Sequence, residues 1–311
     1  MHWEVAPLEG ITTFIYRKAH HDIFGGASCY YTPFFSPTQE RKLSTKEARD
    51  LSPEHNAGIV VIPQVLSKDP TQVLWAQQQV AERGFTELNI NVGCPSGTVA
   101  AKGKGSGMLA DITALDDFLE GVFANNLLPI SVKTRVGVEH HDEFPAILNV
   151  FNQYPIHRLT IHPRVQKDFY KYPVRPEAFA YGIANTSLPL TYNGDLFTVA
   201  DVERFCLQYP NVETIMFGRG VVGNPALLRQ LNGGAPATRE ELQRFTATLY
   251  AGYQAAYGHK GAAAQRMKEL WYSMIHLFAD NQKLDKKMRR LSTPQEYEQT
   301  ERLIFETLVL K

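Results

Sequence analysis

The sequence predicts an α/β chain in which a (β/α)₈ TIM barrel is followed by a small C-terminal helical domain. The 311 residues suffice for a barrel of about 250 residues plus an appendage. Short apolar runs recur about every 25 to 30 residues through the first three quarters of the chain, with helical patterns between them. No strand pattern follows Pro236.

Eight short apolar segments are the expected barrel strands. Turn-forming residues bound them, and most end on a polar side chain. Because parallel barrel strands all end at one rim, their last residues should surround a shared cavity. The expected strands cover residues 3–6, 29–32, 58–63, 87–91, 130–133, 158–162, 190–193 and 214–217.

Helices are expected between these strands. Segment 69–83 opens with Asp69, a good cap, and Pro70, which is tolerated in a first turn. Further helices are expected over 116–125, 143–153 and 198–208, and the polar stretch 37–55 predicts a long loop with a short helix.

We expect a barrel domain over residues 1–235 and a helical domain over residues 236–311. Asn232, two glycines and Pro236 mark the boundary. Thr238 and Glu241 then have the spacing of a capping box, which predicts a helix start, and the pattern stays helical to the end.

Composition narrows the possible functions. Lys and Arg number 32, as do Asp and Glu, which argues against a uniformly basic nucleic-acid-binding protein but permits a local patch. No signal peptide or membrane-length apolar run is evident, so we expect a cytoplasmic protein. The candidate basic patch, for which a solvated helix face is the alternative, comprises Lys283, Lys286, Lys287, Arg289 and Arg290.

The three cysteines predict neither a disulfide framework nor a zinc site, since they are widely spaced. Cys29 and Cys206 fall in a predicted strand and a predicted helix, so we expect both in the core. The histidine pairs 20–21 and 140–141 are expected at the surface, and no bound metal is expected, because adjacent side chains point in different directions.

Polar residues at the strand ends point to a flavin site. An amide, a cation and an imidazole can hydrogen-bond a flat heteroaromatic ring, and glycine loops after the last two strands can bind a phosphate. For Lys133 a Schiff-base role is the alternative. The strand-end residues are Gln64, Asn91, Lys133, His162 and Asn193, with the loops Asn193-Gly-Asp195 and Gly218-Arg-Gly220.

The most specific segment is Asn91-Val-Gly-Cys-Pro95, which a glycine-rich loop follows up to Met108. With it, the chain resembles the tRNA-dihydrouridine synthase family along nearly the whole barrel, and more weakly in the helical region. The other matching segments, in order, are Ala6-Pro-Leu-Glu-Gly10, Lys133-Thr-Arg135, His162 with Arg164, Asn193-Gly-Asp195 and Phe217-Gly-Arg-Gly220.

The resemblance implies that FMN, reduced by NADPH, passes a hydride to C6 of a uracil in tRNA. Cys94 is then the acid that protonates C5, a role for which a thiol must stay protonated at neutral pH. A monomer acting on tRNA is implied. The implied cofactor residues are Pro7, Leu8, Gln64, Lys133, His162, Asn193, Gly194, Asp195, Gly218 and Arg219, and the implied tRNA-contacting residues are Asn91, Lys102, Lys104, Arg164, Arg266, Lys268, Lys286, Lys287, Arg289 and Arg290.

Several positions depart from the family pattern. Pro163 stands where glycine is usual between His162 and Arg164, and Lys171 and Tyr172 replace a glycine expected after Tyr170. Leu8 replaces a common methionine, and Thr13 a common aspartate. These positions surround the expected mouth, so they concern the target nucleotide more than the chemistry, and they indicate a divergent subfamily.

Three other functions stay open. Another FMN barrel reductase could act on a free small molecule, but the basic helical region and the Cys94 segment argue against it. An inactive RNA-binding barrel is disfavoured because Cys94, Lys133 and the glycine loops are all retained. A phosphosugar isomerase or aldolase would be colourless when purified. No dinucleotide-binding fingerprint is present, so the nicotinamide should reach the flavin transiently.

Overall fold

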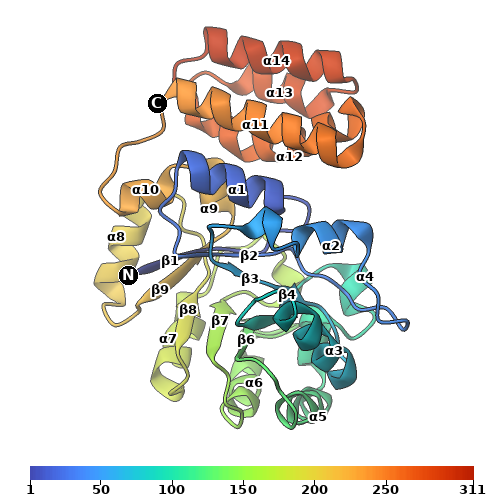
Figure 1. The fold of residues 1–311 in the computed structure, drawn as a ribbon. Helices are drawn as coiled ribbons and strands as arrows, with labels where there is room; N and C mark the ends of the chain where they lie inside the picture. The colour runs from blue at the N-terminus through green and yellow to red at the C-terminus, as the bar shows by residue number, and fades with distance from the viewer.

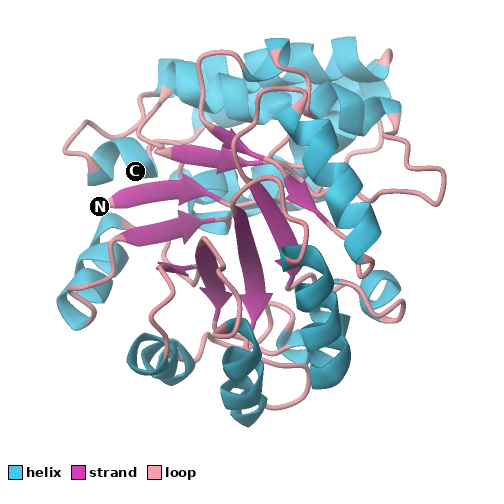
Figure 2. Ribbon diagram, turned by 60° about the horizontal axis from the view of Figure 1, so that its bottom comes forward, coloured by secondary structure: helices cyan, strands magenta, loops and turns pink.

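The computed structural model describes all residues from Met1 to Lys311 and contains a barrel of parallel strands surrounded by helices (Figure 1, Figure 2). The strands are hydrogen-bonded in the order β3-β2-β1-β9-β8-β7-β6-β5-β4. Their bounds are β1 His2–Val5, β2 Cys29–Tyr31, β3 Val61–Ile62, β4 Gln64–Val65, β5 Leu88–Val92, β6 Ile130–Arg135, β7 Arg158–His162, β8 Leu190–Tyr192 and β9 Thr214–Phe217.

The predicted count of eight strands becomes nine because the third strand is broken at Pro63. Proline has no N–H to donate to a ladder, so pairing stops there. β3 pairs with β2 and β4 pairs with β5, so the two short pieces together fill the third barrel position. The (β/α) barrel prediction is confirmed.

Helices cover the outside of the barrel, and their starts follow the predicted capping chemistry. The Asp69 carboxylate accepts from the amide of Thr71 at 2.8 Å, and Thr198 caps the helix that follows it. Sequence analysis did not predict α1 and α7. The helices are α1 Phe14–Ile23, α2 Thr45–Asp50, α3 Pro70–Ala81, α5 Ile112–Phe123, α6 Phe144–Phe151, α7 Pro176–Asn185 and α8 Val199–Gln208, with short segments α4 Gly97–Ala100, α9 Arg219–Gly223 and α10 Leu227–Leu231.

Four C-terminal helices stack together beside α1 at the top of Figure 1. Thr238 Oγ1 accepts from the amide of Glu241 at 3.2 Å, so the predicted capping box forms. The ring of Phe245 lies 5.2 Å from that of Phe24, which joins both regions in one apolar core. We retain the domain division at residue 236 as a proposal. The helices are α11 Arg239–Tyr257, α12 Lys260–Met274, α13 Gln282–Arg290 and α14 Pro294–Thr307.

None of these helices combines the length and apolar character needed to span a lipid bilayer.

Candidate active site

A cavity of about 350 Å³ opens at the carboxyl ends of the strands, a size typical of small-molecule sites. It lies where a (β/α) barrel places its catalytic residues. The segment after β1, the Cys94 loop, the ends of β6 and β7 and the loops after β8 and β9 line it, and Ser273 on α12 adds a wall from the helical region.

Strand alternation explains why basic residues line this cavity. Ser131, Lys133 and Arg135 lie two residues apart on β6, so all three face the barrel interior. Lys133 is only half-buried, but its ammonium has no hydrogen-bond or ion-pair partner. Burial, with a smaller effect of Arg135, lowers the pKa of Lys133 to about 7. An anion bound beside this amine would restore its charge.

Arg135 is a buried connector between two loops of the rim. Its Nε donates to the carbonyl of Gly93 at 3.1 Å, and its Nη1 and Nη2 donate to the carbonyls of Val165 and Phe169 at 2.7 and 2.9 Å. The guanidinium therefore holds the Cys94 loop and the loop after β7 in a fixed relation.

The Cys94 loop is shaped by Asn91. The Asn91 Oδ1 accepts from the amides of Gly93 and Cys94 at 3.0 and 2.9 Å. A side chain on Gly105, whose φ is +57°, would lie 2.9 Å from Cys94 Cβ, so glycine is required there. Cys94 is half-buried in the cavity wall, and burial raises the pKa of its thiol, which keeps it protonated at neutral pH.

His162 is a neutral imidazole with one defined tautomer. Its Nδ1 donates to the carbonyl of Asn193 at 2.6 Å, so Nε2 is the acceptor nitrogen, and it accepts from Arg164 Nη1 at 3.4 Å. Burial, together with the charges of Lys133 and Arg135, lowers the pKa of His162 well below 6.5. The cationic side of the cavity thus comes from Lys133 and the arginines.

The two glycine loops offer unpaired donors. The backbone amides of Gly194, Asp195 and Gly218 have no acceptor within the protein. A Cβ on Gly218 would lie 3.7 Å from both Ala6 and Leu8, inside the cavity. Arg219 Nη2 donates to Asp195 Oδ1 at 2.5 Å beside these amides. Free amides and a guanidinium are suited to a phosphate, so the donor set fits FMN.

Comparison with known proteins decides the family. The family model described as "Dihydrouridine synthase (Dus)" matches residues 4–309. The chain belongs to the dihydrouridine synthase family. It is 28% identical over 228 residues to tRNA-dihydrouridine synthase B of Shewanella oneidensis, covering 73% of this chain and 70% of that one. It is 27% identical over 259 residues to tRNA-dihydrouridine(16) synthase of Pseudomonas syringae pv. tomato, covering 79% and 81%.

Solved structures support the fold alone. The old yellow enzyme homologue from Zymomonas mobilis has a TM-score of 0.55 at 14% identity, covering 78% of this chain and 91% of that one. Morphinone reductase has a TM-score of 0.54 at 10% identity, with 78% and 88% covered.

Most residues assigned to the cofactor from the family resemblance line the cavity, as do Asn91 and Cys94. Gln64 does not. It is fully buried below the cavity, accepts from Asn91 Nδ2 at 2.9 Å and donates to Asn89 Oδ1 at 2.7 Å. Its Oε1 and one of its two N–H groups are engaged by these partners, so it supports Asn91, and we leave it out of the proposed cofactor contacts. The lining cofactor residues are Pro7, Leu8, Lys133, His162, Asn193, Gly194, Asp195, Gly218 and Arg219.

Two residues expected to contact tRNA are buried instead. Arg164 forms a forked ion pair with Asp195 and donates its Nε to the carbonyl of Tyr172 at 2.7 Å. Lys268 donates to the carbonyl of Leu291 at 2.8 Å inside the helical region. Arg266 is half-buried over Gly10 and pairs with Glu269 at 2.9 Å. Both side chains are therefore engaged within the protein, and we leave Arg164 and Lys268 out of the proposed tRNA contacts.

Asn91, also expected to contact tRNA, is buried in the cavity wall. The remaining expected tRNA residues lie on the surface in two places. Lys102 and Lys104 are on the loop beside Cys94, outside the cavity lining, and Lys68 approaches this loop at Gly103. Arg289 on α13 pairs with Asp285 at 2.9 Å. An open hollow of about 660 Å³ on α13 is lined by Lys283, Lys286, Lys287 and Arg290.

Several cavity residues were missed from the sequence. Arg135 could have been found, because it lies two residues beyond Lys133 on the same strand face. Tyr170 and Phe197 lie in irregular loops, and Ser273 comes from the other region of the chain, so no periodic signal identifies them. The missed lining residues include Glu9, Ile11, Phe34, Arg135, Tyr170, Phe197, Val222 and Ser273.

The remaining predictions concern cysteines, histidines and metals. Cys29 is buried as predicted, whereas Cys206 is half-buried at the edge of the core. The surface prediction is wrong for His20, which is buried between the Tyr30 hydroxyl at 2.8 Å and the Pro225 carbonyl at 2.9 Å. No group of three or more His, Cys, Asp or Glu side chains is arranged to hold a metal ion.

Proposed function

We propose that this protein reduces uridines in tRNA to 5,6-dihydrouridine, with FMN as the cofactor and NADPH as the reductant. One observation carries the proposal: a protonated thiol, an unpaired amine and unpaired backbone amides face one cavity in a member of this family. The relatives named above are tRNA-dihydrouridine synthases, and their names agree with this activity.

The cavity residues divide into a phosphate end and a ring end. When bound, FMN supplies the hydride that reaches C6 of uracil. The amides of Gly194, Asp195 and Gly218, with Arg219, would bind its phosphate. Lys133 would stabilise negative charge on the ring, and that charge would raise the pKa of this amine and keep it a cation. His162, whose Nε2 accepts from Arg164 Nη1, would contact the cofactor as a neutral imidazole in the cavity wall.

Cys94 supplies the proton. Its Sγ–H bond breaks as the proton moves to C5 of uracil, which completes the saturation of the C5–C6 bond. The raised pKa keeps the thiol loaded with a proton before the step. The thiolate left behind is favoured electrostatically by Arg135 and Lys133 until solvent protonates it again.

The tRNA would be held by basic residues beside the mouth and on the helical region. We propose a cytoplasmic location and action as a monomer. The proposed contacts are Asn91, Lys102, Lys104, Arg266, Lys286, Lys287, Arg289 and Arg290.

The test is Cys94→Ala in anaerobic single-turnover experiments. FMN content and reduction by NADPH should stay near wild type, because the thiol is not required to hold the cofactor. Reoxidation of the reduced flavin by tRNA should slow by about 10² to 10⁴, the usual contribution of a general acid. Cys29→Ala and Cys206→Ala are matched controls and should reoxidise normally. Reoxidation of Cys94→Ala at the wild-type rate would mean that another group supplies the proton.

A further inference from the structure

Three exposed aromatic side chains stand close together on the loop after β7. The exposed fractions of Phe169, Tyr170 and Tyr172 are 42%, 51% and 58%. Single exposed apolar residues are ordinary, but a cluster of large rings on one loop is typical of a contact surface. Tyr170 lines the cavity, whereas Phe169 and Tyr172, its neighbours in the sequence, are not among the lining residues.

The loop backbone is held in an unfavourable conformation. Phe169 has φ 48° and ψ −107°, a region that side chains other than glycine seldom occupy. Such a conformation persists only when its surroundings enforce it. Here Arg135 Nη2 donates to the Phe169 carbonyl at 2.9 Å, and the Phe169 amide donates to the carbonyl of Gln166 at 3.1 Å.

The backbone of the same loop is also held at Tyr172. Arg164 Nε donates to the Tyr172 carbonyl at 2.7 Å, and the same guanidinium is fixed by Asp195. Two buried arginines therefore fix the backbone at Phe169 and at Tyr172 while both rings stay in solvent. A ligand that stacks on these rings would lose little of its binding energy to ordering the loop.

Three arginines lie beside the Tyr170 ring, and their charge indicates what kind of ligand would bind there. The guanidinium carbons of Arg219, Arg135 and Arg164 lie 4.8, 5.4 and 6.0 Å from the centre of the Tyr170 ring. Flat rings beside cationic groups suit a single-stranded nucleic acid, whose bases stack and whose phosphates are anionic.

We propose that Phe169 and Tyr172 form a stacking platform for the bases that flank the target uridine in RNA. This inference rests on the proposed function, because it assumes that the uridine enters the cavity beside Tyr170. Turning a base into a cavity unstacks it from its neighbours, and stacking on these two rings would compensate for that loss. Phe169 and Tyr172 would thus be substrate-positioning residues outside the chemistry.

The first test compares Tyr172→Ala with Tyr172→Phe, and includes Tyr181→Ala as a control. Tyr181 is 36% exposed on α7 and does not line the cavity. Tyr172→Ala should raise the KM for tRNA about tenfold with FMN content and reduction by NADPH unchanged. Tyr172→Phe, which keeps the ring, and Tyr181→Ala should match wild type. An equal KM for Tyr172→Ala and wild type would overturn the role of Tyr172.

Phe169→Gly separates stacking from backbone strain. Glycine tolerates the positive φ, so the variant should be no less stable to urea than wild type, yet its KM for tRNA should rise as in Tyr172→Ala. A wild-type KM in this variant would overturn the role of Phe169.

Binding of oligoadenylate to the FMN-loaded protein distinguishes the two proposals, since this probe stacks but contains no uridine. Calorimetry should show weaker binding to Phe169→Gly and Tyr172→Ala than to Tyr181→Ala. That result would support the platform even if no dihydrouridine formed. Equal binding by all variants, with dihydrouridine made normally, would overturn the platform and leave the proposed function standing.

Discussion

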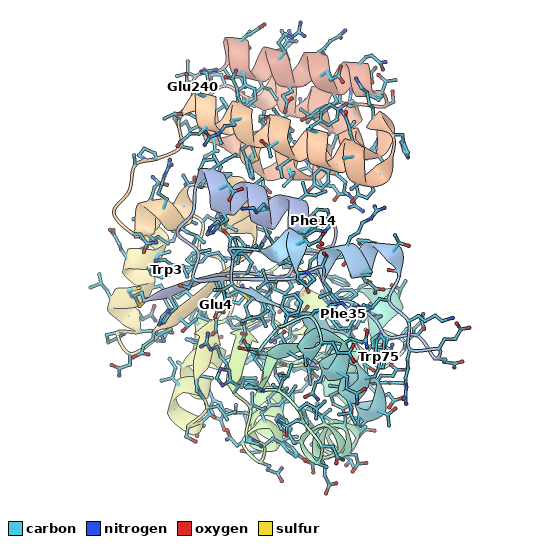
Figure 3. The ribbon with its side chains drawn as sticks, viewed as in Figure 1. Trp3, Glu4, Phe14, Phe35, Trp75 and Glu240 are labelled. Atoms are coloured by element: carbon cyan, nitrogen blue, oxygen red, sulfur yellow. The ribbon has the colours of Figure 1, made fainter.

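Charged side chains are paired at one end of the barrel interior and unpaired at the other. Glu4, labelled in Figure 3, lies towards the amino-terminal ends of the strands. Its carboxylate is 1% exposed and accepts from Arg158 Nη1 at 2.5 Å. At the opposite end, the Lys133 amine faces the cavity without a partner. Charges that satisfy each other hold the barrel together, whereas a charge left unpaired at the mouth is available to a ligand.

The end of the barrel near Glu4, which we call the closed end, also contains buried polar atoms without hydrogen-bond partners. Glu4 Oε2 and the hydroxyls of Tyr31 and Thr160 have no hydrogen-bond partner. Burial consequently outweighs the attraction of Arg158 and raises the pKa of Glu4 above 4.5. The difference between the ends therefore lies in access to solvent and ligand, since both ends contain polar groups that burial penalises.

A large effect on the reaction rate should come from removing the unpaired charge at the mouth. Lys133→Met should slow reduction of the flavin by NADPH about 10²-fold, because negative charge on the ring would lose its counter-charge. Stopped-flow absorbance would measure the rate, and FMN content would report binding separately. Wild-type binding and reduction in this variant would remove Lys133 from the cofactor site.

The opposite result is expected at the closed end. Arg158→Met leaves the buried Glu4 carboxylate unpaired and should cost about 3 kcal/mol of unfolding free energy, at the low end for a buried pair because the Arg158 side chain is 28% exposed. Urea unfolding of the FMN-free protein would measure it. Flavin reduction per folded molecule should stay normal, and a stable variant with slow reduction would erase the distinction between the ends.

The pH dependence of stability sharpens the contrast. The pKa of Lys133 is about 7 when folded and about 10.4 in an unfolded chain, so between these values the unfolded state binds more protons. The FMN-free wild-type protein should therefore gain stability as pH rises from 7 to 10, relative to Lys133→Met. The variant should be the more stable protein at pH 6, and the difference in unfolding free energy between the two proteins should vanish by pH 10. A difference independent of pH would show that Lys133 is not desolvated.

The smallest effect should come from the solvent-exposed basic residues of the α13 hollow. Replacing Lys286, Lys287 and Arg290 with glutamine should weaken tRNA binding several-fold and reduce the slope of log affinity against log salt by about 0.7–0.9 for each phosphate that is no longer neutralised. Lys42→Gln, a barrel surface change at a lysine paired with Glu40, is the control. An unchanged slope would mean that the α13 hollow does not bind phosphate.

The sequence identified the barrel because strand periodicity and capping residues are local signals. The same signals placed polar residues at the strand ends, and nine of the ten cofactor residues that the family resemblance implies line the cavity. The sequence could not show that Gln64 lies outside the cavity lining. Only the pairing of β4 with β5 reveals that its side chain is hydrogen-bonded to Asn89 and Asn91.

The burial of charged side chains is the second feature that could not be predicted from the sequence. Arg164 is assigned to tRNA from the family resemblance and Lys268 from the basic helical region, and neither signal shows their partners, Asp195 and the Leu291 carbonyl, which lie 31 and 23 residues further along the chain. The positive φ of Phe169 has no sequence signal either, because it is imposed by the distant Arg135.

The central claim is that this cavity reduces uridine within tRNA. The most direct measurement incubates the FMN-loaded protein with NADPH and unmodified tRNA transcripts, then digests the RNA and identifies its nucleosides by mass spectrometry. We predict that defined uridines gain two hydrogens, and that Cys94→Ala forms this product far more slowly. Oxidation of NADPH through the flavin with no dihydrouridine in any tRNA would contradict the account.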